Sequence, residues 1–408
     1  MQPVTLEIRG RFWDSQIYSG ELTLFDDEGA VYKVDWAKAI DNIALENADV
    51  QTAVRVAFSD SDLFYNNKVR RILLDPEIKA PIIKQLTDLS TRKYSISHNM
   101  LVKYESPFDF LPTDTEMYYH KLFAGDESGL YSASRAGKQG RFESEAKKHH
   151  DAKVFQIKAS DSFTSIATAF GDDGLFEFEF NRSNRHNLLD KGVRLANRPC
   201  SACDWAFQSV VGWTTDNAFF VNYFETDKAK DPAGRSRVID RVYEESEMFS
   251  SMSRPGVAWG AREKMYRLDS KGITVSNYSR GKKQGPSKAT DGKKDKSKKP
   301  SFEGFGYIQD NFPIEEFVSA GTAPFGTVLE FDEHITVIRS DGFTDQFFGE
   351  PVQWRIFPRS SNYSNQLHII YEDYMLVVSF VHDYFVNQTE KLSGFAKNTK
   401  AMEEEFSY

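Results

Sequence analysis

The sequence predicts an all-β fold that is built from one repeated unit. Short apolar segments are joined again and again by turns rich in Asp and Gly, as in antiparallel β-hairpins. Aromatic residues make up 14% of the 408 residues, with 33 Phe and 18 Tyr against only 14 Pro, which is typical of packed strands and not of disordered chain. Turns at Gly129, Gly174 and Asn217 are 45 and 43 residues apart, which indicates a repeat of about that length.

Seven hairpins of this kind can be located along the chain. Their turns fall at residues 26–29, 125–129, 171–174, 215–217, 269–272, 340–342 and 371–374. In the third hairpin, the strand 175–180 alternates Phe with Glu177 and Glu179, so one face is predicted to be buried and the other solvated. A further hairpin, pairing Val54–Phe58 with Leu63–Tyr65, is an alternative that would change the count.

A repeat of this length matches the four-stranded blade of a β-propeller. Through its Asp- and Gly-tipped hairpins, the chain resembles β-propeller repeat proteins in general across most of its length, although it lacks the recurring Trp-Asp of WD repeats and the double glycines of kelch repeats. We expect a single propeller over residues 1–408 with seven blades, within a range of six to eight. A strand around Leu6–Trp13 would complete the sheet of the last hairpin. A β-sandwich or two smaller β domains are the alternatives.

Two insertions interrupt the pattern. Residues 75–90 predict an amphipathic helix, because Asp75 and Pro76 form a start signal and are followed by apolar residues at helical spacing, namely Ile78, Ile82, Ile83, Leu86 and Leu89. Residues 280–300 form a basic low-complexity loop that we expect to be disordered. Nine cationic residues less Asp291 and Asp295 give this segment a net charge of +7, and leave −16 on the rest of the chain.

Composition excludes several classes of function. A net charge of −9 argues against whole-surface affinity for nucleic acid or anionic membrane, and no apolar stretch is long enough for a membrane span. The sequence begins with no leader pattern and contains only Cys200 and Cys203, which predicts a cytoplasmic protein with ordinary thiols. Local signatures of serine hydrolases, zincins, P-loop enzymes and EF-hands are missing, so no catalytic residue, metal or cofactor is predicted.

The most unusual polar stretch is residues 354–368. Arginine forks bind phosphate or carboxylate and aromatic rings stack on ligands, so this mixture would suit recognition of a small molecule. The alternative is that the polar side chains satisfy the backbone of a long connection at the closing blade. The candidate binding residues are Trp354, Arg355, Arg359, Asn365, Gln366 and His368.

The function predicted from these features is that of a non-catalytic, protein-binding scaffold in a cytosolic multi-protein complex, by analogy with other propellers. One alternative is a nucleic-acid-associated accessory protein whose basic loop contacts nucleic acid or an acidic partner. The contact residues would then be Lys282, Lys283, Lys293, Lys294, Lys296, Lys298 and Lys299. A second alternative is a propeller enzyme with a site near the central channel. The sequence does not predict an oligomeric state.

Overall fold

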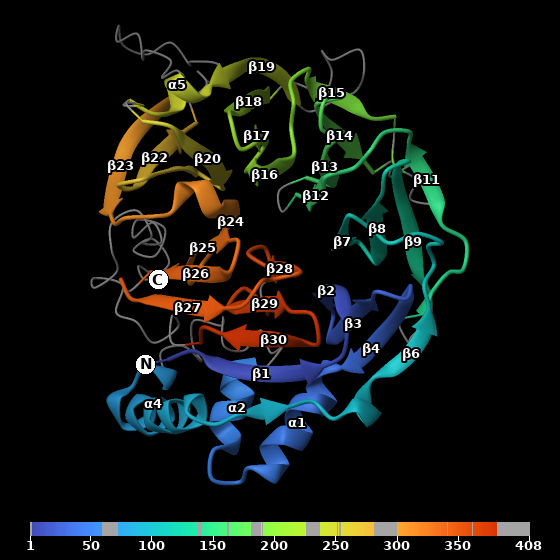
Figure 1. Cartoon of the computed structure of the whole chain (residues 1–408), viewed down its shortest axis with the longest axis vertical. Coiled ribbons are helices and arrows are strands. Elements are labelled where there is room, and N and C mark those ends of the chain that lie inside the picture. The colour runs from blue at the N-terminus through green and yellow to red at the C-terminus, as the bar shows by residue number, and fades with distance from the viewer. Residues whose placement is uncertain are drawn as a thin grey trace, which may run out of the picture. The chain divides into compact units, whose positions relative to one another are not determined.

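The thirty strands of the described residues form seven mainly antiparallel sheets, and each sheet is one blade of a seven-bladed β-propeller (Figure 1). The predicted fold class is therefore confirmed. The computed structural model describes residues 2–58, 72–136, 141–160, 163–180, 189, 191–225, 237–250, 252, 254–280, 300–340, 342–360 and 362–381. The chain divides into two compact units, Met1–Ile157 with Glu316–Tyr408, and Lys158–Glu315.

The first unit contains blades 1, 2, 6 and 7, numbered in chain order. Blade 1 consists of β2 (Phe12–Tyr18), β3 (Glu21–Asp26), β4 (Ala30–Asp35) and β6 (Val102–Glu105). Blade 2 consists of β7 (Asp114–Tyr118), β8 (Lys121–Gly125) and β9 (Leu130–Ala136), with β10 (Arg141–Phe142) and β11 (Lys147–His150) both on β9. Blade 6 consists of β24 (Phe317–Ala323), β25 (Gly326–Phe331), β26 (His334–Arg339) and β27 (Thr344–Phe348). Blade 7 consists of β28 (Gln353–Ile356), β29 (Gln366–Ile370), β30 (Tyr374–Ser379), β1 (Val4–Arg9) and β5 (Tyr94–Ser95).

The second unit contains blades 4 and 5 and blade 3 except for the first two residues of β12. Blade 3 runs through β12 (Gln156–Ala159), β13 (Ser165–Ala169), β14 (Leu175–Glu179) and β15 (Val193–Ala196). Blade 4 runs through β16 (Ala202–Ala206), β17 (Ser209–Trp213), β18 (Ala218–Glu225) and β19 (Arg237–Glu244), and the short helix α5 (Glu245–Met248) follows it. Blade 5 runs through β20 (Gly256–Ala261), β21 (Lys264–Asp269), β22 (Gly272–Ser279) and β23 (Ser301–Gln309). Short 3-10 helices occur at His98–Met100 and Ile314–Glu316.

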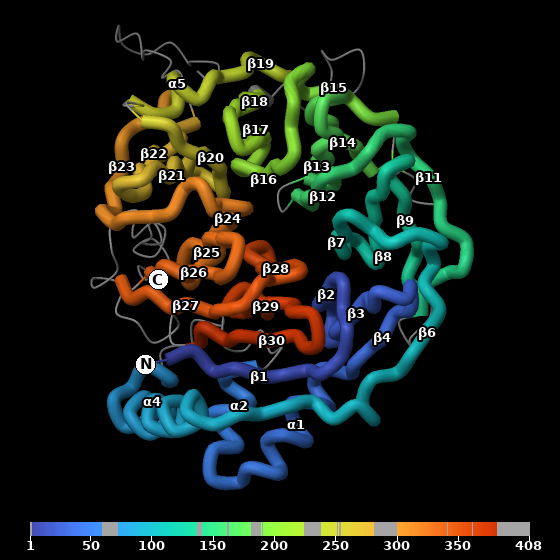
Figure 2. Tube along the Cα trace, in the orientation of Figure 1, coloured from blue at the N-terminus to red at the C-terminus, as the bar shows by residue number. Residues whose placement is uncertain are grey.

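The first strand of the chain completes the last blade, as the sequence predicts. β1 lies beside β30 (Figure 2) and pairs with it antiparallel. The register runs from Val4 opposite Ser379 to Arg9 opposite Tyr374. Leu6 and Ile8 on β1 are fully buried. Blade 7 therefore joins strands from both ends of the chain, and burial of the β1 side chains stabilises this union.

Six of the seven predicted turns join the second and third strands of a blade, and the sixth turn along the chain does not. Residues 340–342 join β26 to β27, the third and fourth strands of blade 6. The equivalent turn is Asp332-Glu333, between β25 and β26. It has an aspartate but no glycine, whereas residues 340–342 have both Asp341 and Gly342, so composition favours the wrong turn.

The described residues between β4 and β6 are mostly helical and contain more helix than predicted. It holds α1 (Trp36–Glu46), α2 (Gln51–Phe58) and α4 (Pro76–Ser90), which share an apolar core with β1. The helix expected over residues 75–90 is confirmed as α4, and the Asp75 carboxylate accepts a hydrogen bond from the backbone N–H of Glu77. The alternative strand Val54–Phe58 is wrong, because these residues lie in α2, while Leu63–Tyr65 lies outside the described residues.

The prediction that the Glu side of β14 is solvated is also wrong at Glu177. This side chain is buried and its carboxylate accepts a hydrogen bond from the Tyr223 hydroxyl on β18, at 2.7 Å. A propeller blade packs against a neighbour on each face, so alternation along a strand does not identify a solvated side. The polar side chain is accommodated by a hydrogen bond and not by water.

Candidate functional site

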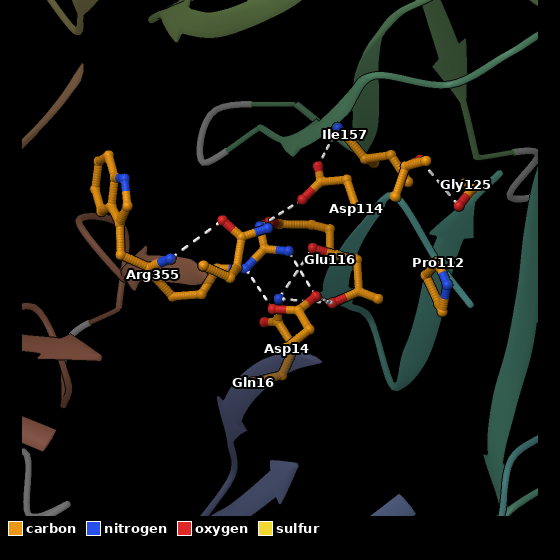
Figure 3. Close-up of polar contacts among 12 residues, drawn as sticks. Asp14, Gln16, Pro112, Asp114, Glu116, Gly125, Ile157 and Arg355 are labelled. Carbon is orange, nitrogen blue, oxygen red and sulfur yellow. Dashed lines mark hydrogen bonds and ion pairs between the residues drawn. The ribbon is translucent and has the colours of Figure 1, made fainter. Parts of the chain in front are cut away.

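The most conspicuous polar cluster is an ion network around Arg355, which comes from the first strands of three blades. Arg355 lies on β28, Asp14 on β2 and Asp114 on β7, and all three side chains are buried. Figure 3 shows the guanidinium between the two carboxylates. Nε and Nη2 of Arg355 donate to Oδ1 and Oδ2 of Asp14 at 2.7 and 2.6 Å, and Nη1 lies 2.5 Å from Oδ1 of Asp114.

Both carboxylates have further donors. The Thr115 hydroxyl donates to Oδ2 of Asp14 at 2.6 Å, and the backbone N–H of Ile157 donates to Oδ2 of Asp114, also at 2.6 Å. All four carboxylate oxygens therefore accept at least one hydrogen bond or ion pair. A buried carboxylate is tolerated only when it is paired in this way.

The electrostatics of the cluster favour a charged arginine beside a neutral histidine. Burial disfavours the cation, but the charges of Asp114 and Asp14 outweigh burial, and the pKa of Arg355 is raised above its ordinary value. His368 is the cross-strand neighbour of Arg355 on β29. Burial, followed by the nearby charge of Arg355, lowers the pKa of His368 to about 3. Its Nδ1 lies 3.0 Å from the Ser15 hydroxyl, and its Nε2 lies 3.4 Å from the Gln366 side-chain oxygen.

This arrangement suits the joining of blades better than the binding of a ligand. Arg355 uses its donors on two aspartates, and His368 has a neighbour at each ring nitrogen. Gln366 is equally buried, on the same strand as His368. These contacts favour a structural role for Arg355 and His368, whereas the buried Nε2 of Gln366 has no hydrogen-bond partner among the described residues. The partners of Arg355 are, however, aspartates of other blades and not the local backbone.

The other three predicted site residues make contacts elsewhere. The Trp354 indole N–H donates to Glu330 at 2.9 Å and to Ser319 at 3.0 Å, on the side of blade 6, and burial raises the pKa of Glu330. Arg359 pairs with Glu116 at 3.4 Å. The Asn365 amide donates to Ser379 at 3.1 Å and to the Ala57 carbonyl at 3.4 Å. The six predicted residues thus do not converge on one point.

The sequence contains a signal for the network that the hairpin search does not use. Asp14-Ser15-Gln16-Ile17-Tyr18 and Asp114-Thr115-Glu116-Met117-Tyr118 have matching residue types and are offset by 100 positions. They form equivalent parts of β2 and β7. The two strands lie side by side, because the Gln16 amide donates to the backbone oxygen and the hydroxyl of Thr115 at 2.9 and 3.1 Å.

Each of these strands ends in a tight turn, and the two turns differ in composition. After β2 the turn is Ser19-Gly20, with φ of 49° and 79°, and after β7 it is Tyr119-His120, with φ of 47° and 59°. The Tyr119 ring packs edge-on against Tyr118 at 4.5 Å, and the His120 ring packs edge-on against Tyr18 at 5.6 Å. We call Tyr18, Tyr118, Tyr119 and His120 the aromatic turn cluster.

The remaining candidates from the sequence are metal-ligating groups, the two cysteines and the basic loop. No group of three or more His, Cys, Asp or Glu able to hold a metal is found among these residues. Cys200 and Cys203 are buried, and burial raises the pKa of the Cys200 thiol to about 12. The lysines of the basic loop, residues 282–299, lie outside the described residues. No described helix is long and apolar enough to cross a membrane.

Comparison with known proteins finds similar solved structures but no family. No family model matches the chain, and no curated protein matches it. The β-propeller domain of Cps50 (Swd1) from Myceliophteria thermophila is similar over 93% of this chain and 99% of that chain, with a TM-score of 0.49 and 9% identity. A proposed 6-phosphogluconolactonase from Bacteroides fragilis is similar over 66% of this chain and 79% of that chain, with a TM-score of 0.41 and 8% identity. Neither likeness bears on what this chain binds.

Proposed function

We propose that this protein is a non-catalytic, protein-binding scaffold of the cytoplasm, and that it contacts a partner protein through the aromatic turn cluster. The observation that supports the proposal most directly is the backbone of Tyr119 and His120. Both residues have positive φ, in a two-residue turn between antiparallel strands. A count of only two cysteines in 408 residues agrees with a reducing compartment.

The turn after β7 has a conformational cost that other residues in the same turn would avoid. Two-residue turns with positive φ at both positions favour Asn-Gly or Gly-Gly, and a residue with a Cβ loses about 1–2 kcal/mol in this conformation. The equivalent turn of blade 1 uses Ser19-Gly20, which reduces that cost. Strain of this kind is retained mainly where the side chains serve a function.

The side chains held by this turn are suited to a protein interface. Tyr119 is 53% exposed, and its ring is held against Tyr118. Tyrosine combines a large apolar ring with a hydroxyl and few rotatable bonds, so it binds partners at a small entropic cost and is common among binding hot spots. The aromatic turn cluster therefore presents a preorganised surface.

The test is to give the blade 2 turn the sequence of its blade 1 counterpart, in the double variant Tyr119→Ser/His120→Gly. Relief of strain should leave the variant as stable as the wild type, or up to about 2 kcal/mol more stable, in urea unfolding. Some partner proteins should copurify with the wild type from the native host in stoichiometric amounts. The amount recovered with the variant should be at least about tenfold lower, as expected when a hot spot is lost.

A matched control separates this surface from exposed aromatics in general. Tyr307 on β23 is 52% exposed, so Tyr307→Ser removes a similar side chain from another blade. The control should retain the partner. If the double variant recovers the same proteins as the wild type in equal amounts, the aromatic turn cluster is not the contact surface.

The charge of the basic loop supports a second candidate function, that of a nucleic-acid-associated accessory. Arg280, at its described end, lies with its guanidinium 4.0 Å from the centre of the Phe207 ring. Lysines without interleaved aromatics give salt-sensitive attraction that does not depend on base sequence. Deletion of residues 281–299 should then abolish retention on DNA and RNA columns at low salt. Unchanged retention would rule this function out.

A further inference from the structure

Blade 6 contains a row of aromatic side chains that crosses all four of its strands. Phe317 on β24, Phe331 on β25, His334 on β26 and Phe348 on β27 are successive cross-strand partners. Their ring centres are separated by 6.2, 4.9 and 6.0 Å. Phe331 is buried, whereas Phe348 is 73% exposed. Among the described residues, the row thus runs to the edge strand and ends there, with no further strand beyond it.

The hydrogen bonds of β27 show which of its backbone groups face that edge. The Arg339 N–H donates to the Phe343 carbonyl, and the Gly349 N–H donates to the Glu333 carbonyl, both at 2.9 Å. In an antiparallel pair the bonded residues alternate along the strand. The backbone N–H and C=O groups of residues 344, 346 and 348 therefore point away from β26.

This edge has few of the features that protect edge strands. Natural proteins guard an edge with Lys, Pro or a β-bulge. The residues of β27 include no Lys or Pro, and its pairing with β26 has a regular register. Among the described strands it pairs with β26 alone. Phe343, directly before the strand, is also exposed.

We propose that β27 is where an extended segment of a partner protein is added as a fifth strand of blade 6, with an aromatic residue opposite Phe348 and basic residues beside it. Only another strand pairs all the outward backbone groups of residues 344, 346 and 348, and an aromatic side chain opposite Phe348 continues the row. This inference rests on the proposed protein-binding function and names a second contact on a different blade.

The charges around Phe348 determine the basic character of the segment. Asp332, Glu333 and Glu350 are all exposed. Glu333 is bonded through its backbone to Gly349, and Glu350 follows directly, so these carboxylates lie at the Phe348 end of the strand. Lysine or arginine beside the aromatic residue of the added segment would complement them.

A second copy of this chain fits the edge less well than such a segment. Two copies of β27 that pair antiparallel about Gln346 would place each Phe348 opposite Thr344 of the other copy, so the aromatic row would not continue. The carboxylates of Glu333 and Glu350 would gain no basic partner from the residues of β27, which include none.

The experiment blocks the edge without disturbing the sheet. Gln346→Pro removes an outward N–H, and no bond to β26 is lost, because residue 346 is not bonded to that strand. A random peptide library displayed on phage is selected on the full-length wild-type protein, and the selected peptides are then measured on Gln346→Pro, on Phe348→Lys and on the control Phe305→Ala. Phe305 is an exposed aromatic on the edge strand of blade 5.

We expect selected peptides that contain an aromatic residue with Lys or Arg at nearby positions, and affinities that fall at least about tenfold on Gln346→Pro and on Phe348→Lys but not on Phe305→Ala. Peptides that bind Gln346→Pro as tightly as wild type, or that are acidic, would overturn the proposal. So would a wild-type dimer that Gln346→Pro converts to a monomer in light scattering, because a second copy would then occupy the edge. The Tyr119→Ser/His120→Gly variant should bind the peptides as wild type does, so this test and that of the aromatic turn cluster fail independently.

Discussion

Replacement of Arg355 by methionine should be among the most damaging single substitutions in the first unit. Methionine keeps much of the side-chain length but removes the cation that faces Asp14 and Asp114 at 2.5–2.7 Å. Both aspartates are buried and would be left without their counter-charge. Removing one partner of a buried ion pair costs about 3–5 kcal/mol, which is a large part of the roughly 5–15 kcal/mol that stabilises a folded protein.

Urea unfolding provides the measurement, with a shift in midpoint at an unchanged slope taken as the change in stability. The control is Arg9→Met, which breaks the ion pair with Glu7 at a position where the arginine side chain is 87% exposed. A surface pair of this kind contributes at most about 1 kcal/mol. The two variants should therefore differ by at least about 2 kcal/mol.

A combined variant shows whether charge, and not lost packing, causes the damage. Arg355→Met together with Asp14→Asn and Asp114→Asn removes the charges at all three positions and should recover more than half of the lost stability, because burial of uncharged amides costs less than burial of unpaired carboxylates. An equal loss in the single and combined variants would refute the electrostatic explanation, as would a loss below about 1 kcal/mol for Arg355→Met.

Three further predictions concern two buried histidines, a turn glycine and one buried hydrogen bond. Burial lowers the pKa of His368 to about 3. Burial, together with the charges of Lys147 and Lys121, lowers the pKa of His149 to about 4. As pH falls, both histidines therefore bind protons in the unfolded chain before they do so in the folded protein. Stability should be full above about pH 6.5 and should decline by about 1 kcal/mol per pH unit for each histidine towards pH 5; urea unfolding at several pH values should show this slope, and His368→Gln should reduce it. Gly174→Ala should destabilise more than Gly29→Ala in thermal unfolding, because both have positive φ but only at Gly174 would the new Cβ lie 2.2 Å from a backbone oxygen, that of Ala196. Tyr223→Phe removes the hydroxyl that donates to buried Glu177 and should cost about 1–3 kcal/mol in urea unfolding.

The fold was predictable because its local and global signals agree. A glycine at position 174 meets a need for positive φ in the hairpin of β13 and β14. Turns of similar composition occur 45 residues before it, at Gly129, and 43 residues after it, at Asn217. The misplaced hairpin of blade 6 shows the limit of this reasoning. Its true turn, Asp332-Glu333, carries a weaker turn signal than Ser340-Asp341-Gly342, so position in the blade and not composition defines it.

The helical region shows a second limit. Val54 to Phe58 reads as alternating apolar and polar residues over a few positions, yet Ala53, Val54 and Ala57 also share one face of a helix. Short apolar segments fit both periods, and packing of α2 with the other helices and β1 decides between them. A hairpin was therefore a reasonable but wrong alternative.

The sequence predicts Arg355 as a site residue but not its partners. Arg355 stands out because a charged residue is unusual between Trp354 and Ile356, but its partner Asp14 is 341 residues away. A pairing of that length is set by the closing of blade 7 beside blade 1, which local patterns do not encode. The repeat of Asp14–Tyr18 at Asp114–Tyr118 is the one sequence signal that relates the two acidic partners.

That repeat also links the ion network to the aromatic turn cluster. Side chains alternate along a strand, so Asp114 and Tyr118 occupy the same face of β7, as Asp14 and Tyr18 do on β2. Arg355 bridges both strands at the aspartates, four residues before the tyrosines. If this bridge holds the two strands in position, Arg355→Met should speed hydrogen exchange at the backbone amides of residues 118–121, and Arg9→Met should not. Unchanged exchange in a folded Arg355→Met protein would show that each turn is held by its own hairpin alone.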